Sequence, residues 1–410
     1  MKIVADLHVH SRYSRATSKD MDAGTIGLWA ARKGINLVGT GDFTHPAYLK
    51  ELKKSLTPSA EGLFRLRGPE NGVHFMLTAE ISTIYPAGGR TRRIHTIIMA
   101  PSFEAVDRIN RALSRHGRLD YDGRPMFGFD VKDLVKLVMD VSPLCMAVPA
   151  HAWTPWYSVF GSKSGFDSIE ECFGDQADHI HAIETGLSSD PPMNWRLAPL
   201  DRVTLISNSD AHSPEKLGRE ATVFGCSMRY QDIVSAIRTK DRKRILYTLE
   251  FFPEEGKYHF DGHRGCRISY SPEQTRQHEG VCPVCGRPLT IGVLNRIEKL
   301  ATRKAGVVPK NAIPFRHLIP LKEIMADVLS IGPGTVTVDR LYTQAVVDRG
   351  VPELEILMDM PEIELGRILP AGVSEAVLKT RNGRVDIEPG YDGEYGNVRI
   401  RKDAQPPRNR

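Results

Sequence analysis

The sequence is poor in cysteine and contains no long apolar run. Its 6 cysteines in 410 residues are too few for the disulfide framework of a secreted scaffold. No stretch approaches the roughly 18–20 apolar residues that a membrane-spanning helix needs. The N-terminus also lacks a basic start followed by a long apolar core, so we expect no signal peptide and no membrane partner. We therefore predict a cytoplasmic protein.

The composition that remains is typical of a globular protein. Hydrophobic residues make up 41% and charged residues 26% of the chain, and a length of 410 residues predicts two or three domains. The net charge of +5 is unevenly placed, because residues 256–320 hold 11 Lys and Arg against 4 Asp and Glu. Such a basic block favours a polyanionic partner, although an ordinary solvated surface would explain it equally well.

The pattern of the chain changes near residue 251. Up to there, short apolar runs such as "INLVGTGD" alternate with helix-like stretches such as "AGTIGLWAARKG". This alternation predicts an α/β domain with a mainly parallel sheet or barrel over residues 1–250. Residues 251–290 are rich in turns and metal-ligand side chains and predict a small zinc-binding module. Residues 291–396 read as a mainly helical segment, and residues 397–410 as a flexible basic tail.

Residues that commonly bind metals follow several of the predicted strands. Side chains two positions apart in a strand point to the same side, so His8 and His10 present two imidazoles together, with Asp6 on the same face. Asp210 and His212 repeat this spacing. Active sites of α/β folds form at the carboxyl ends of strands, so we expect one shared metal site there. The further ligand-type residues at strand ends are Glu80, His95, His151 and Glu184.

These motifs resemble, in their order along the chain, those of the PHP (polymerase and histidinol phosphatase) metallophosphoesterases. The stretches that carry the resemblance are "DLHVHSRYS", "GTGDFTH", "TAEIS", "IHTIIMA", "PAH" and "NSDAH". The resemblance implies a distorted (β/α)7 barrel with two or three divalent metals at its mouth, which would be Zn, Mn, Fe or Mg. It places metal ligands at His8, His10, Glu80, His95, His151, Asp210 and His212, and catalysis at Asp210, His8, His10 and His151.

Two positions depart from the pattern of that superfamily. Phe43 stands where a histidine is usual, and Arg15 stands where an acid or a histidine is usual. Asp42 or His45 is the expected substitute ligand, and both departures put the third metal in doubt. We expect Glu184 to support a ligand through a hydrogen bond instead of binding a metal itself.

A second metal site is predicted after the barrel. His263-x-x-Cys266 and Cys282-x-x-Cys285 form two knuckles with the spacing of a closed, tetrahedral structural zinc site. All three cysteines are expected to bind the zinc, whereas the fourth ligand could be His263, His259 or His278. His263 is preferred because its spacing mirrors that of the other knuckle.

Basic and aromatic residues near the two metal sites suggest contacts to nucleic acid. Arginines on the zinc module would bind phosphates, although some zinc modules only stabilise a fold; they are Arg264, Arg267 and Arg287. The loop after His151 would stack on or hold a displaced base, although aromatic residues there also suit packing of the loop. The loop residues predicted to bind DNA or the base are Trp153, Trp156, Tyr157 and Lys163.

Nearly the whole chain resembles a narrower family, the endonuclease Q enzymes. The stretches that carry this resemblance are "EFFPEEGKYHFDGHRGC", "CPVCGRPLTIGVLNRIEKLA" and "PGYDGEYG". It implies a nucleoid-associated DNA repair endonuclease that cuts 5′ of deaminated bases (uracil, hypoxanthine and xanthine) and of abasic sites. The implied partner is duplex or single-stranded DNA with a damaged base, and a sliding clamp is a further candidate. Two alternatives stay open, a PHP phosphatase of a small monoester and a nucleic-acid-binding protein with a decayed PHP domain.

Overall fold

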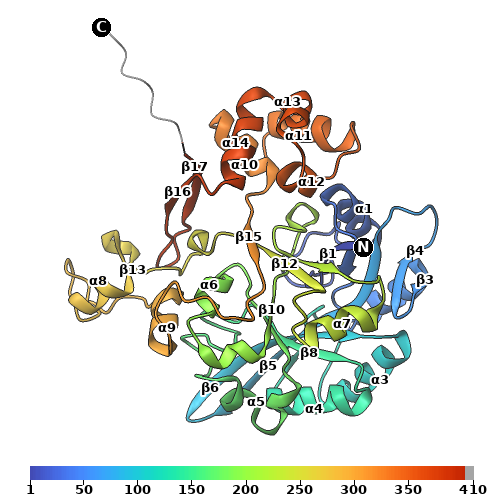
Figure 1. Cartoon of the computed structure of the whole chain (residues 1–410). Coiled ribbons are helices and arrows are strands. Elements are labelled where there is room, and N and C mark those ends of the chain that lie inside the picture. Colours follow the sequence, from blue (N-terminus) through green and yellow to red (C-terminus); the bar gives the residue numbers. More distant parts are fainter. Residues whose placement is uncertain (402–410) are drawn as a thin grey trace.

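A distorted α/β barrel forms the centre of the computed structural model, which describes residues 1–401 (Figure 1). Strands β1, β2 and β5 pair in parallel, as do β9 and β10, whereas β6 runs antiparallel to both of its neighbours, β5 and β8. The strands that form the barrel are β1 (Lys2–Asp6), β2 (Leu37–Gly39), β5 (His74–Ala87), β6 (Arg90–Ala100), β8 (Met146–Pro149), β9 (Ala182–Glu184) and β10 (Thr204–Ile206).

The barrel closes through contacts just beyond the carboxyl ends of its strands. The backbone N–H of Ala152, after β8, donates to the carbonyl of Glu184 at 2.9 Å, which joins β8 to β9. Val9, after β1, forms a parallel bridge with Ala211, after β10, so the first and last strands meet. The segments after β1, β8 and β10 that carry predicted ligands therefore face one common mouth. Glu80 and His95, which were predicted at strand ends, instead lie within the long antiparallel strands β5 and β6.

The helix predicted for the stretch "AGTIGLWAARKG" is confirmed. Helix α1 (Ala23–Lys33) begins at Asp22, whose side chain accepts from the N–H of Thr25, and it ends at Gly34, which has a left-handed φ of 87°. The other helices of this region are α2 (Pro46–Ser55), α3 (Phe103–Leu113), α4 (Val131–Val141), α5 (Ile169–Phe173), α6 (Pro191–Asn194) and α7 (Tyr230–Arg238). The outer strands are β3 (Leu56–Ala60), β4 (Leu63–Leu66), β7 (Met126–Phe127), β11 (Ala221–Gly225) and β12 (Ile245–Glu250).

The rest of the chain forms the zinc module and a segment of mainly helices, which lie beside and above the barrel in Figure 1. The module contains β13 (Asp261–His263), β14 (Ile268–Tyr270) and α8 (Pro272–Gln277). The later elements are α9 (Val293–Leu300), β15 (Phe315–His317), α10 (Leu321–Leu329), α11 (Val336–Tyr342), α12 (Glu353–Met358), α13 (Glu362–Ile368), α14 (Ala371–Arg381), β16 (Val385–Glu388) and β17 (Asn397–Ile400).

The predicted tail begins later than the sequence suggested. Asn397–Ile400 form β17 and pair with β16, because the alternation in "NVRI" lets Val398 and Ile400 pack against the hydrophobic core. Residues 402–410 of the predicted tail lie outside the described residues. Within residues 1–401, none of the helices combines the length and the apolar character that a membrane span requires.

A buried ion pair and a shared sheet join the helical segment to the barrel. The Nζ atom of Lys33 lies 2.6 Å from Glu353 Oε2, which also accepts from the hydroxyl of Tyr342 at 2.7 Å. Removing one partner of such a pair would leave an uncompensated buried charge, at a cost of roughly 3–5 kcal/mol. In addition, β15 extends the barrel sheet by pairing in parallel with β12. The helical segment is therefore fixed against the barrel at two places.

Candidate metal centre

Three side chains from the first and last barrel strands converge on one point. In this set, which we call group 1, the Nε2 atoms of His8 and His10 lie 3.6 and 3.1 Å from Asp210 Oδ1. All three of these atoms are buried and have no hydrogen-bond partner. Buried polar atoms normally have a hydrogen-bond partner. Three such atoms that point at one another without a hydrogen bond therefore mark a place where a ligand would bind. A divalent cation fits this donor set of two imidazoles and one carboxylate.

Carboxylates hold both imidazoles of group 1 in place from behind. His8 Nδ1 lies 3.0 Å from Glu184 Oε2, and His10 Nδ1 lies 3.0 Å from Asp42 Oδ1. A proton on each Nδ1 would be donated to the carboxylate, which leaves the Nε2 lone pair free for a metal. The amide of Asn208 in turn donates to Glu184 Oε1 at 2.8 Å.

A second set of ligand-type side chains, group 2, lies beside the first. His95 Nδ1 and His151 Nε2 lie 2.7 and 3.0 Å from Glu80 Oε1. The other oxygen of Glu80, Oε2, lies 3.3 Å from His10 Nε2, so one carboxylate contacts both groups. The arrangement suits two neighbouring cations that share Glu80.

The charge around group 1 favours cations. Burial by itself lowers the pKa of His8, but the carboxylates of Glu184, Asp210 and Glu80 outweigh burial and raise that pKa well above its usual value. Likewise, although burial opposes ionisation of Asp210, His8 and His10 hold its pKa below its usual value. Group 1 therefore has a negative potential that divalent metals would also satisfy. In group 2, burial lowers the pKa of His95 to about 4, which leaves its imidazole neutral, as a metal ligand must be.

Three residues at this mouth have strained backbone conformations. Asp42, His151 and Asp210 have φ values of 46°, 29° and 47°, in a region that residues with side chains rarely adopt. Each such residue costs on the order of 1–3 kcal/mol and persists only where its surroundings hold it. In all three cases the turn brings a metal-type side chain toward the common mouth.

The structure does not bring every predicted ligand into the two groups. Asp42 is a support for His10, and its Oδ2 atom accepts from the N–H and the hydroxyl of Ser11 at 2.6 and 2.7 Å, so it lies outside both groups and its role as a ligand stays a prediction. His45 lies apart, with its ring stacked on Tyr13 at 4.3 Å and its Nε2 atom 3.2 Å from the carbonyl of Asp120.

His212 lies at the edge of group 1. Its ring centroid is 4.5 Å from that of His10, and its Nδ1 atom is 2.9 Å from the backbone carbonyl of Asp210. With 32% of its side chain exposed, it borders the opening of the site.

The knuckles of the zinc module come together as predicted from their spacing. One ligand atom from each of His263, Cys266, Cys282 and Cys285 lies within 4.8 Å of all the others. Of the alternative fourth ligands, His278 stacks on Tyr270 at 4.8 Å, and His259 is buried beside Phe260. The four-residue set has the composition of a closed structural zinc site. Arginines 264, 267 and 287 are exposed on this module.

The aromatic loop after His151 divides into packing residues and surface residues. Trp153 is 1% exposed and donates from Nε1 to Asn194 Oδ1 at 2.8 Å, so its surroundings match the packing alternative, and its base-binding role stays a prediction. Tyr157 packs against His95 at 4.6 Å, and Lys163 is exposed. Trp156, which is 38% exposed, meets Tyr258 edge to face at 5.8 Å.

Trp156 and Tyr258 line a cavity of about 680 Å³ next to the metal centre. Thr154, whose hydroxyl lies 3.1 Å from His151 Nδ1, connects this cavity to group 2. Arg219 connects it to group 1, because its Nε atom donates to the carbonyl of Ser209 at 2.9 Å. Tyr258 and Arg219 were not predicted from the sequence, since neither belongs to a metal-type motif. The signals that could have found them are that Tyr258 lies within the stretch "GKYHF" and that Arg219 follows the motif "NSDAH".

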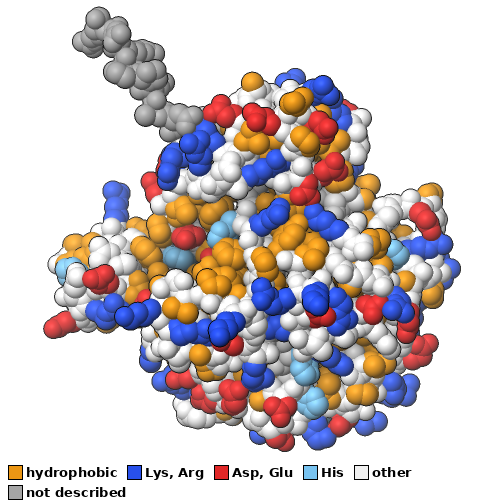
Figure 2. Space-filling model, viewed as in Figure 1, with side chains coloured by type: hydrophobic (Ala, Val, Ile, Leu, Met, Phe, Trp, Pro, Cys, Tyr) orange, Lys and Arg blue, Asp and Glu red, His pale blue; other side chains and the backbone are white. Residues whose placement is uncertain are grey.

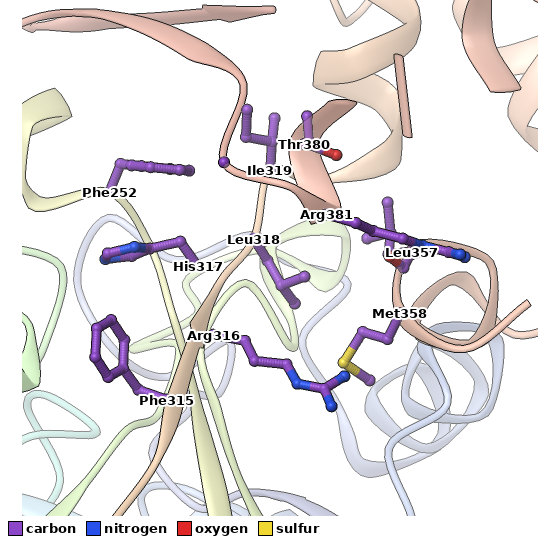
Figure 3. Close-up of a pocket in the computed structure, with 11 residues that line it drawn as sticks. Phe252, Phe315, Arg316, His317, Leu318, Ile319, Leu357, Met358, Thr380 and Arg381 are labelled. Carbon is purple, nitrogen blue, oxygen red and sulfur yellow. Dashed lines mark hydrogen bonds between the residues drawn. The ribbon is translucent and has the colours of Figure 1, made fainter. Parts of the chain in front are cut away.

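Another cavity, of about 410 Å³, lies where the barrel meets the helical segment (Figure 3). Its walls include Phe252, Arg316 and His317 near β15 and Arg381 on α14, and none of the predicted site residues lines it. Arg381 donates to the carbonyls of Ile356 and Met360 at 2.6 and 2.7 Å, so it ties α14 to α12. On the face shown in Figure 2, hydrophobic and histidine side chains gather where the zinc module, the barrel and the helical segment meet.

Two buried acids lie behind Glu184. Glu220 and Glu250 are both 0% exposed, and Glu250 accepts from the hydroxyl of Thr185 at 2.9 Å. Burial, with Asp190 as a further cause, raises the pKa of Glu250 to about 8. Burial and the nearby Glu250 raise the pKa of Glu220 well above its usual value. Both carboxyls are therefore held neutral in the folded protein under mildly acidic conditions.

This pair should make the barrel less stable as the pH rises. Between the unfolded pKa near 4.5 and the folded value of about 8, the folded state binds more protons than the unfolded state, so stability falls with pH. Glu250→Gln removes that penalty. We expect the free energy of unfolding in urea to change little at pH 5 and to rise by on the order of 2–4 kcal/mol at pH 9. Glu61→Gln, at an exposed position, is the control; equal effects of Glu250→Gln at both pH values would contradict the assignment.

The chain is similar over nearly its whole length to solved structures of lesion-specific nucleases. It matches the novel lesion-specific endonuclease PfuEndoQ from Pyrococcus furiosus with a TM-score of 0.86 and 32% identity, over 98% of this chain and 96% of the other. It also matches an endonuclease Q complex with a 27-mer duplex carrying an abasic lesion at the active site. That TM-score is 0.84, with 32% identity over 98% of this chain and 97% of the other.

A curated relative gives a partial match. The uncharacterized protein MJ0043 of Methanocaldococcus jannaschii is 33% identical over 295 residues, which cover 69% of this chain and 35% of MJ0043. This chain therefore spans about a third of that relative's length. No family model matches the chain.

Proposed function

Because the chain belongs to the endonuclease Q family, we propose that it is a metal-dependent DNA repair endonuclease that cuts 5′ of damaged bases. The proposed substrates are uracil, hypoxanthine, xanthine and abasic sites in DNA. The observation that carries the proposal is the meeting of groups 1 and 2 at Glu80, beside a cavity of about 680 Å³. A decayed catalytic domain would have no reason to keep six buried or partly buried ligand-type side chains in contact.

The residues of groups 1 and 2 would hold the cations that this chemistry requires. Such cations supply an activated water and neutralise charge on a phosphate. Glu184 and Asp42 fix the rings of His8 and His10, and the hydroxyl of Thr154 fixes the ring of His151. Protein side chains thus set the positions of the ligand atoms before substrate arrives, so little reorganisation is needed during the reaction.

The cavity is suited to an extruded nucleotide. Trp156 and Tyr258 offer ring faces for a base, and the walls reach both ligand groups through Thr154 and Arg219. Lys257, which also lines the cavity, can only donate hydrogen bonds. Deamination replaces an amino group, which cannot accept from Lys257, with a carbonyl oxygen, which can. This difference supports a preference for deaminated bases, which are also weakly paired and cheaper to extrude.

We assign the parts of the chain to separate tasks. Residues 1–250 would carry out the chemistry, and residues 251–290 and 291–396 would hold the DNA. The exposed arginines 264, 267 and 287 on the zinc module support that assignment, because a basic surface binds phosphates without regard to sequence. Within residues 1–401, nothing supports the sliding clamp considered as a partner.

Cleavage of defined duplexes tests the proposal. We expect the protein, incubated with Mg²⁺, Mn²⁺ or Zn²⁺, to cut the lesion strand of labelled duplexes that contain uracil, hypoxanthine, xanthine or an abasic site, on the 5′ side of the lesion. A duplex without a lesion should stay intact, and EDTA should stop the reaction. Asp210→Asn, purified in parallel, shows whether a contaminating nuclease contributes. Equal cutting of damaged and undamaged duplexes, or of none, would refute the proposal.

A further inference from the structure

Arg124 lies at the mouth of the metal centre, on the loop between α3 and β7. Its Nη1 atom is 2.9 Å from Glu80 Oε2, and 24% of its side chain is exposed. Among the described residues, no other lysine or arginine forms an ion pair with a carboxylate of group 1 or group 2. The sequence reasoning assigned no role to Arg124, because it stands outside every metal-type motif.

The loop holds Arg124 firmly against the supports of group 1. The N–H of Gly123 donates to the carbonyl of Tyr13 at 2.9 Å, and the hydroxyl of Thr44 donates to the carbonyl of Gly123 at 3.1 Å. A Cβ atom at position 123 would lie 2.4 Å from Asp42 Oδ2, so only glycine allows the loop to approach the carboxylate that orients His10. The position of the guanidinium is therefore coupled to the geometry of the metal ligands.

Most donors of this guanidinium are unused. Only Nη1 is hydrogen-bonded, to Glu80, whereas Nε and Nη2 make no hydrogen bond within the described residues and are not buried. Arginine has five N–H donors in a fixed plane that matches two oxygens of a phosphate. A side chain that served only to neutralise Glu80 would not need to keep the remaining donors at the opening of the site.

We propose that Arg124 is a catalytic residue that donates hydrogen bonds to a non-bridging oxygen of the phosphate undergoing hydrolysis. This inference rests on the proposed function only in that the substrate is a phosphodiester. Negative charge on the non-bridging oxygens must be stabilised as water attacks phosphorus, and a fixed cation stabilises it without reorganisation. The guanidinium forms and breaks no covalent bond and transfers no proton, and Glu80 holds it in place during the reaction.

Three variants separate this role from a structural one. Arg124→Met removes the donors, Arg124→Lys keeps the charge without the planar fork, and Arg118→Met is the control. Arg118 lies on the same loop, but its side chain is 76% exposed and pairs with Asp120. The measurements are the rate of cutting of a uracil duplex, the rate of hydrolysis of bis(p-nitrophenyl) phosphate, the metal content by mass spectrometry, and the affinity of the metal-loaded protein for inorganic phosphate by calorimetry.

We expect Arg124→Met to lower kcat on both substrates by roughly 10²–10³-fold with an unchanged metal content, and Arg124→Lys to recover part of that loss. Phosphate affinity should fall in step, and added guanidinium ions should partly restore the Met variant. A Met variant with the parental kcat and phosphate affinity would overturn the inference. A Met variant that loses activity only because it loses metal, and that added guanidinium ions do not rescue, would also overturn it. If the parent cuts no DNA, the proposed function fails, and phosphate affinity and hydrolysis of the small diester still decide the role of Arg124.

Discussion

Replacing Glu80 with glutamine should remove most of the metal from the barrel and lower the rate of DNA cleavage by roughly 10³-fold or more. Glu80 is 2% exposed, and its two oxygens contact His95 and His151 on one side and His10 on the other. An amide keeps the shape of the side chain but loses the negative charge, and its NH2 group would point a donor at the ligand atoms of either group 1 or group 2. Glu184 also contacts both groups, but at His8 Nδ1 and at the backbone N–H of His151, whereas Glu80 contacts the ligand atoms of both groups, so this single change affects both cations.

The metal content of Glu80→Gln, measured after dialysis against a metal buffer, checks this expectation together with single-turnover cleavage of a uracil duplex. Glu70→Gln is a matched control, since Glu70 has a side chain that is 77% exposed and lies outside the barrel mouth. The zinc of the module should persist in the variant, which gives an internal reference for protein folding. A Glu80→Gln protein that retained the parental metal content and rate would show that the two groups do not act as one centre.

The parts of the site that sequence could predict are those that follow from local periodicity. His8 and His10 were placed together because alternate residues of a strand share a face, and Asp210 because it follows a later strand of the same barrel. The zinc ligands follow from spacing alone, since each knuckle is a local structure. Helix α1 was predicted from the helix-like stretch "AGTIGLWAARKG", which the glycine at position 34 ends.

The parts that sequence missed depend on which neighbour a side chain meets. Asp42 was predicted as a ligand, but it contacts His10 Nδ1 and Ser11, which are partners that only the folded chain provides. Trp153 was predicted to bind DNA or the base, with packing of the loop as the alternative, and Asn194 accepts from its indole N–H in the interior. The antiparallel β5–β6 hairpin was also missed. Its turn at Gly88 and Gly89, which have φ values of 59° and 72°, is a hairpin signal that we did not use.

The zinc module should lose its fold when one of its cysteines is replaced. Between residues 261 and 290, Cys282 and Leu289 are the buried hydrophobic residues, so almost no apolar core exists to stabilise the module without metal. Zinc binding in comparable small modules is worth roughly 10–16 kcal/mol, which is more than any other single interaction could supply here. Cys282→Ser should therefore release the zinc and expose the module to proteolysis, whereas the barrel, which has its own core, should stay folded.

The consequence for DNA binding follows from the charges that the module carries. Without zinc, Arg264, Arg267 and Arg287 are no longer held in place. The slope of log Kd against the logarithm of the salt concentration should therefore fall by up to about 3, since each lost phosphate contact lowers the slope by about 0.9. Cys226→Ser is the control, because Cys226 is a free thiol outside both metal sites. Hydrolysis of bis(p-nitrophenyl) phosphate should be equal in both variants, since that small diester needs only the barrel. A Cys282→Ser protein that kept its zinc and its salt dependence would mean that the module neither needs this thiolate nor holds the DNA.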